Sequence, residues 1–278
     1  RTPDDLLREM DRVGIGEALV HAGTAVISHP NDGNAEILRS TRNQARLHPC
    51  WVVLPPATSG LSRPDALVAQ MQENGVRAAR IFPTEHNFPL IGRYLRALLS
   101  PLEIARIPLT IDAGRTSWSQ IALDWRGIFE IADAHPDLPI ILLREGGTTE
   151  RILFEVWDQF PNIHLETSYM QASGILEDIT DRFGHSRLLF GSGLPAGNNL
   201  RRLLGLPGRP PSEDPRWPCG KSGYRVFDIH GHLGLWCRKY YRDGTAEQMV
   251  ARMDALGIER FAVSDIVGIG SDYRAGND

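Results

Sequence analysis

Two histidines separated by one residue, His230 and His232, are the residues of this chain whose types and spacing best suit a metal site. They follow a short apolar run, Tyr224 to Ile229, which has the composition of a buried strand that ends in a glycine-rich loop. Alternate side chains of a strand point to the same side, so the two imidazoles could bind one divalent cation together. The spacing predicts half of a metal site. The alternative is that one histidine caps the strand and the other lies on the surface.

Further polar residues lie near the ends of other predicted strands. One interpretation is a pocket for a carboxylated substrate, in which Arg80 or Arg144 holds the carboxylate through two hydrogen bonds. The other is a network of salt bridges that closes one end of the fold. The candidate catalytic residues are Asp112 and Arg144, and the candidate substrate-binding residues are Arg80, His86, Glu145 and Glu166.

The elements that must position these residues alternate regularly between helix and strand. Because strands that alternate with helices form parallel sheets, the pattern predicts an α/β fold and, at this number of units, a (β/α)8 TIM barrel. The predicted helices cover 2–13, 35–45, 64–73, 90–99, 125–134, 149–160 and 172–183, and the strands that follow them cover 17–21, 48–54, 76–82, 107–112, 139–143, 162–167 and 187–191.

The alternation of helices and strands stops at a segment rich in proline and glycine. The sequence after this segment repeats the sequence at the start of the chain. Moving the sequence by 243 positions (245 less 2) places Thr245 on Thr2 and Gly257 on Gly14 without a gap. We therefore divide the chain into a barrel that lacks its first strand (1–199), a linker (200–223), and a third segment (224–278). That third segment is either the start of a second copy or the strand that completes the barrel.

A parallel barrel with seven strands has two open edges, which favour pairing with another strand. We expect the strand at 224–229 to fill the gap, so that the first strand of the barrel is C-terminal in the chain. Swapping of this strand with a neighbouring chain would make the protein a homodimer through its C-terminal segment.

The segment Asp228-Ile229-His230-Gly231-His232 resembles the first strand of the amidohydrolase superfamily, in particular its amidohydrolase-related (amidohydrolase 2) branch. The segments 124–142 and 187–195 resemble the approach to the sixth strand and the eighth-strand motif of that family. The resemblance implies a metal-dependent barrel enzyme, such as a hydrolase, decarboxylase or other lyase, that acts on a small cyclic or carboxylated molecule. It also implies a divalent metal, with zinc as our first choice, bound by His230 and His232.

The chain departs from the family at the other three metal-ligand positions. Asp112 and Arg144 stand where the family has histidines, and Gly193 stands where it has an aspartate. Because arginine cannot become a metal ligand and glycine has no side chain, we expect Arg144 to pair with Asp112 and to take the electrostatic place of the cation. The alternative is that His230, His232 and the Asp112 carboxylate together hold zinc and leave its fourth position open. Two hypotheses follow: a metal-dependent enzyme, or a degenerate pseudoenzyme barrel with a structural or regulatory role beside an active copy.

The composition restricts the remaining classes of function. The chain of 278 residues has 42% hydrophobic residues and a net charge of -4, which suits one barrel and argues against binding to nucleic acid or to anionic lipid. No apolar run approaches the length needed to span a membrane. Three cysteines without metal-site spacing suit a reducing compartment. We expect a cytoplasmic protein whose partner is a small molecule.

Overall fold

The computed structural model describes most of the N-terminal region and two segments near the C-terminus. The described residues are 2–56, 60–112, 124–144, 150–170, 175–192, 226–233, 244–256 and 258–265. The predicted linker, the candidate residue Glu145, and Gly193 lie outside these ranges.

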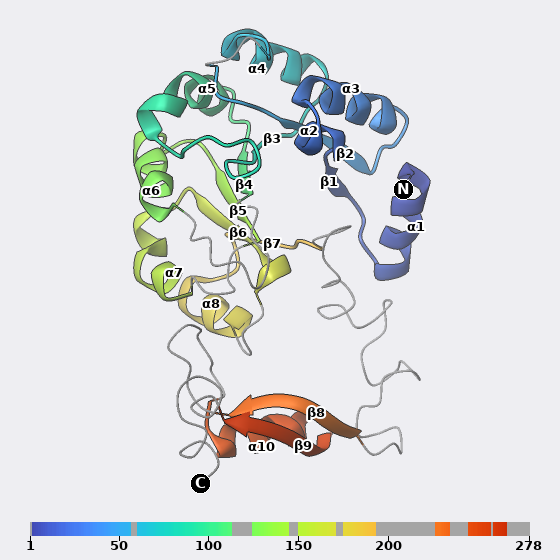
Figure 1. Cartoon of the computed structure of the whole chain (residues 1–278), viewed down its shortest axis with the longest axis vertical. Helices are drawn as coiled ribbons and strands as arrows, with labels where there is room; N and C mark the ends of the chain where they lie inside the picture. The colour runs from blue at the N-terminus through green and yellow to red at the C-terminus, as the bar shows by residue number, and fades with distance from the viewer. Residues whose placement is uncertain are drawn as a thin grey trace.

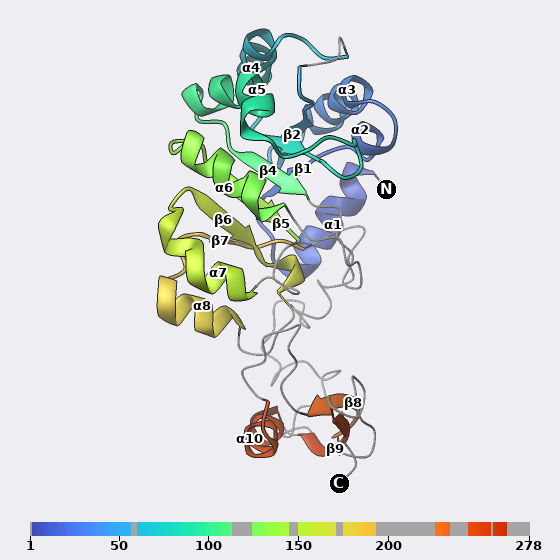
Figure 2. The same cartoon turned by 60° about the vertical axis from the view of Figure 1, so that its left-hand side comes forward.

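Seven parallel strands form the main sheet, and their order in space is their order in the chain. Every strand pairs in parallel with the next one. Figures 1 and 2 show that the strands follow one another around a curved wall, with α3 to α8 on its outer side. The strands are β1 (Ala18–Val20), β2 (Leu47–Val52), β3 (Ala78–Ile81), β4 (Leu109–Asp112), β5 (Ile140–Leu143), β6 (Ile163–Glu166) and β7 (Leu188–Leu189). The predicted fold class is confirmed.

The helices lie close to their predicted positions, with differences at their ends, except for the short α2, which the sequence pattern did not predict. They are α1 (Pro3–Val13), α2 (Thr24–Ile27), α3 (Pro30–Thr41), α4 (Pro64–Glu73), α5 (Gly92–Ile104), α6 (Trp125–Ala134), α7 (Glu150–Val156), α8 (Ile175–Phe183) and α10 (Ala246–Leu256). Short 3-10 turns follow α7 at Trp157–Gln159 and β6 at Thr167–Tyr169. None of the helices in the described ranges is both long and apolar enough to cross a membrane.

Capping residues explain where the helices begin and end. Thr2 forms a capping box with Asp5, and Gly14 ends α1 with a φ of 75°. The predicted start of the second helix at Ala35 was wrong, because His29 accepts a hydrogen bond from the Asn31 amide and Pro30 occupies the first turn. The helix predicted for residues 90–99 was also too short at its end, because α5 continues through Pro101 to Ile104.

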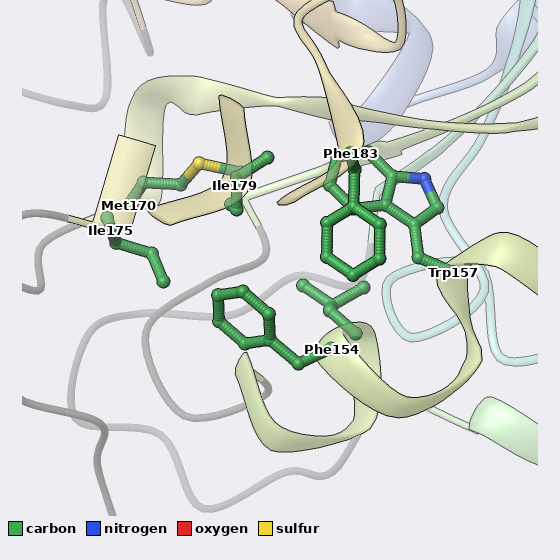
Figure 3. A pocket seen from close by; sticks show the side chains of 7 residues that line it. Phe154, Trp157, Met170, Ile175, Ile179 and Phe183 are labelled. Atoms are coloured by element: carbon green, nitrogen blue, oxygen red, sulfur yellow. The ribbon is translucent and has the colours of Figure 1, made fainter. Parts of the chain in front are cut away.

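The core lies between the curved sheet and the helices outside it. Four leucines of α5 are fully buried, and so are the strand residues Leu109, Leu142 and Leu165. Apolar side chains of α7 and α8 meet around a small pocket near Trp157 and Phe183 (Figure 3). The residues that line this pocket are apolar, so it belongs to the packing of the two helices and offers no groups for catalysis.

A second unit consists of β8 (Val226–Leu233), α10 and β9 (Ile258–Asp265), in which β8 and β9 form a separate parallel sheet. The bounds of α10 exceed those of α1 by 243 (246 less 3 and 256 less 13), which is the offset of the sequence repeat.

The strand β8 differs from the prediction in its length and in its partner. It does not end at Ile229 but continues through His230 and His232 to Leu233, because the pairing with β9 resumes at Gly231 after an irregularity. Within this chain β8 pairs with β9 and not with β1 or β7. The expected closure of the barrel within one chain is therefore not confirmed, and the division into domains stays a prediction.

A buried asparagine fixes the end of β2 against α3. The Asn34 side chain donates a hydrogen bond to the Val52 carbonyl at 2.8 Å and accepts one from the Val52 amide at 2.9 Å. Asn34 is only 5% exposed, so water cannot replace these bonds. This contact joins the helix to the strand end that precedes β3.

We predict that Asn34→Ala lowers the free energy of unfolding by about 2–4 kcal/mol, because it leaves a buried amide and a buried carbonyl without partners. Urea denaturation followed by circular dichroism measures this loss. Asn43→Ala is the matched control, since Asn43 is exposed and should change the stability by less than about 0.5 kcal/mol. Equal stability of the two variants would contradict the role given to Asn34.

Candidate functional site

A buried carboxylate at the end of β4 is the centre of the candidate site. Asp112 is 1% exposed, and two guanidinium groups contact it. Arg144 donates from Nε to Oδ1 at 2.8 Å and also from Nη2 to the same oxygen, while Arg80 donates from Nη2 to Oδ2. Both oxygens of Asp112 are thus engaged by fixed cations.

The sheet register brings these three residues together. Arg80 lies in β3 opposite Thr110 of β4, and Asp112 lies opposite Leu143 of β5, which directly precedes Arg144. Because the carboxyl ends of parallel strands lie at one edge of the sheet, the three side chains meet there. The predicted pairing of Arg144 with Asp112 is confirmed, and Arg80 joins the same carboxylate.

Arg144 reaches Asp112 from a backbone conformation that is unusual for a residue other than glycine. Its φ is 59°, in the left-handed region. In this conformation its amide donates a hydrogen bond to Glu166 Oε2 at 3.3 Å. Glu166 also accepts bonds from the Ser168 amide at 2.6 Å and the Ser168 hydroxyl at 2.7 Å. The Glu166 carboxylate therefore supports the Arg144 backbone and the turn after β6.

Gly191 allows the chain after β7 to pass close to Glu166. A Cβ atom at Gly191 would lie 1.4 Å from Oε1 of Glu166, so no other residue fits there without displacing the carboxylate. The Gly191 amide donates to the Thr167 hydroxyl at 3.4 Å. The ends of β5, β6 and β7 are thus joined through Glu166 and its neighbours.

The charges around Asp112 keep it ionised. Burial alone would raise the pKa of this carboxyl, but Arg80 and Arg144 together outweigh burial, and the pKa lies below its ordinary value. The side chains of Arg80 and Arg144 are about one fifth accessible, with exposures of 20% and 22%. Glu85 Oε1 lies 3.8 Å from Arg144 Nη2, which is a longer and more exposed ion pair.

His21 and Phe82 complete the surroundings of Arg80. The Nδ1 atom of His21 lies 3.3 Å from Arg80 Nη1, and burial together with the Arg80 charge lowers the His21 pKa to about 4. The Phe82 ring centre lies 4.8 Å from the Arg80 guanidinium carbon and 5.6 Å from the His21 ring centre. Our choice of site residues missed both: His21 had a signal as a polar residue at a strand end, whereas Phe82 had none.

Three of the other predicted residues, His86, His230 and His232, lie outside this cluster. His86 lies beside Phe82, at 5.8 Å between ring centres, and its Nε2 atom is 3.1 Å from the Val26 carbonyl. His230 and His232 belong to β8, in the separate sheet, so the structure does not bring them to the strands that carry Asp112. Their side chains are outside what the structure describes, and their predicted role stays a prediction.

Comparison with models of known protein families identifies the family of this chain. The model of the amidohydrolase family (amidohydrolase 2) matches residues 3–218. The chain belongs to the amidohydrolase family. The match covers the whole seven-stranded sheet, and therefore Arg80, Asp112 and Arg144. None of the curated proteins compared with the chain matched it.

Solved structures with similar folds support the barrel architecture. An uncharacterized TIM-barrel protein from Bordetella bronchiseptica is 20% identical, with a TM-score of 0.53 over 74% of this chain and 76% of that chain. A 2,6-dihydroxybenzoate decarboxylase complexed with 2,6-dihydroxybenzoate is 18% identical, with a TM-score of 0.56 over 74% and 82%. A 5-carboxyvanillate decarboxylase from Novosphingobium aromaticivorans, with bound manganese, is 12% identical, with a TM-score of 0.52 over 73% and 74%.

Members of the amidohydrolase family bind a divalent metal, but the cluster around Asp112 does not fit one. No group of three or more histidine, cysteine, aspartate or glutamate side chains suited to a metal occurs among the described residues. Both oxygens of Asp112 accept from guanidinium groups, and a cation there would meet two like charges. The residues at these strand ends suit the binding of an anion.

The low pKa of His21 predicts that acid destabilises the fold. A histidine in the unfolded chain binds its proton near the ordinary pKa of 6.5, whereas folded His21 does so only at about 4. The neutral form therefore contributes its full stability above pH 6.5, and this contribution is lost as the pH falls towards 4.

We expect the melting temperature of the wild type to fall more between about pH 7 and pH 4.5 than that of His21→Gln. Differential scanning fluorimetry measures the two slopes. His185→Gln is the control, because His185 is exposed and its loss should leave the slope unchanged. An NMR titration that placed the His21 midpoint near 6.5 would contradict the contact with Arg80.

Proposed function

We propose that this amidohydrolase family member is an enzyme of the hydrolase or decarboxylase type, acting on a small carboxylated and preferably cyclic molecule. The observation that carries the proposal is the pair of partly accessible arginine side chains, Arg80 and Arg144, at the strand ends on either side of β4. Asp112 offsets one of their two positive charges, and the longer ion pair with Glu85 offsets the other. A substrate carboxylate that displaced Glu85 would meet the Arg144 guanidinium, and arginine binds carboxylates through paired hydrogen bonds.

The relatives support this substrate class. The 2,6-dihydroxybenzoate decarboxylase holds an aromatic carboxylate in its structure. A carboxylate that enters the present site would compete with Glu85, whose contact with Arg144 is 3.8 Å long. In this proposal the Glu85 carboxylate forms a weak ion pair with Arg144, and the substrate carboxylate replaces it there.

Zinc is the metal proposed for this chain, with His230 and His232 as its ligands. The support is the spacing of the two imidazoles and the divalent metal of the family. When bound by these histidines, zinc would supply Lewis-acid chemistry. The cluster at Asp112 contributes no ligand to it, because its oxygens are already engaged.

A second candidate is the degenerate pseudoenzyme barrel with a structural or regulatory role. The observation that favours it is that Asp112 and Arg144, at positions where the family has metal ligands, pair with each other, and Arg80 pairs with the same carboxylate. In that case the site would bind no substrate. Release of carbon dioxide from 2,6-dihydroxybenzoate by the purified protein, measured against a heat-inactivated sample, separates the two candidates.

For the substrate proposal we predict that Glu85→Gln strengthens the binding of 2,6-dihydroxybenzoate about fivefold. The reason is that a charge pair about 4 Å apart in water is worth about 1 kcal/mol, and the variant frees Arg144 from it. Isothermal titration calorimetry measures the dissociation constant. Glu130→Gln is the matched control, since Glu130 pairs with the exposed Arg126 on α6 and should bind as the wild type does. Unchanged affinity in Glu85→Gln would argue against a carboxylate site at Arg144.

For the metal proposal we predict about one zinc ion per chain, lost in the double variant His230→Ala, His232→Ala and retained in Asp112→Asn. Elemental analysis of the purified proteins measures the metal content. A wild-type protein without zinc would contradict the proposed ligands. Loss of zinc in Asp112→Asn would instead show that Asp112 is a ligand and that the anion-binding interpretation is wrong.

A further inference from the structure

Two buried nitrogen atoms beside the Asp112 cluster have no hydrogen-bond partner in the described part of the chain. They are Nε of Arg80 and Nδ1 of His86. Both belong to side chains that contact the Phe82 ring, whose centre lies 4.8 Å from the Arg80 guanidinium carbon and 5.8 Å from the His86 ring centre. Buried polar atoms without partners are rare in folded proteins. These two atoms are therefore groups that a bound molecule can engage.

The contact with Val26 determines which nitrogen of His86 carries the hydrogen. Nε2 lies 3.1 Å from the Val26 carbonyl oxygen, and a carbonyl oxygen only accepts hydrogen bonds. The hydrogen is therefore on Nε2, and in the neutral imidazole Nδ1 keeps a lone pair and accepts. The Nε atom of Arg80, by contrast, is always a donor. The two unpartnered atoms are thus one acceptor and one donor.

The turn after β3 connects His86 to the arginines of the proposed substrate site. The His86 amide donates to the Phe82 carbonyl at 2.9 Å, which closes this turn. Glu85 lies in the same turn, and its carboxylate is 3.8 Å from Arg144 Nη2. A substrate carboxylate that displaces Glu85 therefore acts on the turn that carries His86.

We propose that Nδ1 of His86 accepts a hydrogen bond from a hydroxyl group of the substrate whose carboxylate the two arginines bind. The inference rests on the proposed function and names a specificity-determining residue within it. The carboxylate offers acceptor oxygens to Arg80 Nε, and the hydroxyl offers its hydrogen to Nδ1. A carboxylate without a hydroxyl group leaves Nδ1 unpaired, and this lowers its affinity. The site therefore selects hydroxylated carboxylates.

Two substitutions separate the acceptor at Nδ1 from the bond to Val26. His86→Asn keeps an oxygen acceptor near the position of Nδ1 but is too short to reach the Val26 carbonyl. His86→Gln places an amide N–H near the position of Nε2 and has no acceptor near Nδ1. The side chain of His86 is the only change in each variant, so a preference between ligands reports on the lost atom, whatever the stability of the variant.

Isothermal titration calorimetry measures the dissociation constants of benzoate and of meta- and para-hydroxybenzoate. The wild type should bind one of the two hydroxybenzoates about tenfold more tightly than benzoate. His86→Asn should keep most of this preference, and His86→Gln should bind benzoate and the hydroxybenzoates equally. His185→Gln is the matched control, because His185 is exposed and its loss should leave the preference unchanged.

The outcomes distinguish a failure of this inference from a failure of the proposed function. A wild type that binds all three compounds equally overturns the inference and leaves the carboxylate site intact. A preference that His86→Gln retains also overturns it, because the hydroxyl group is then recognised elsewhere. A wild type that binds none of the three overturns the proposed function and the inference together.

Nitrogen NMR of the imidazole rings tests the tautomer without any ligand. The signals that are lost in His86→Gln or in His86→Asn belong to His86, and in the wild type they should show the hydrogen on Nε2 and none on Nδ1. A neutral ring with its hydrogen on Nδ1 would overturn the proposal, because Nδ1 would then be unable to accept.

Discussion

The buried charge of Asp112 is the constraint on which the arrangement of this site depends. A carboxylate removed from water costs several kcal/mol unless cations and hydrogen bonds replace its hydration. Arg80 and Arg144 provide that compensation from the strands on either side. The three central strands of the wall are therefore fixed in register by their apolar layers and also by one electrostatic cluster at their carboxyl ends. Loss of either arginine would leave the buried Asp112 carboxylate with one of its two guanidinium partners.

The same cluster limits the chemistry of the strand ends. Guanidinium groups supply positive charge where other proteins use a metal ion, but they do not release a proton near neutral pH and cannot activate water as a metal does. They can hold and orient an anion. Proton transfer must then come from another group. His21 is held neutral beside Arg80, and the histidine pair of β8 lies in another sheet. In the proposed function the two arginines therefore bind the substrate, and proton transfer falls to a group outside this cluster.

Much of the fold followed from local signals in the sequence. The helix ends at Gly14 and at Asn74-Gly75 were marked by residues that stop helices, and the parallel sheet followed from the alternation of elements. The pairing of Asp112 with Arg144 followed from their place at neighbouring strand ends. Three features depend on tertiary geometry and could not be predicted: the bond from Arg80 to Asp112, the positive φ of Arg144, and the use of Glu166 as a support for the backbone.

The sequence repeat relates the edge of β1, which has no partner among the described residues, to the paired edge of β9. The chain has two strands of the same kind, β1 and β9, and both present an edge that suits β8. Among the described residues β8 is the strand that pairs with such an edge, and it pairs with that of β9. In the single chain the small sheet is paired, since α10 connects β8 to β9 over a short distance along the chain. Pairing in the main sheet requires a longer closure, but it offers a second neighbour in β7. The balance between loop closure and an extra ladder of hydrogen bonds then decides which edge stays free.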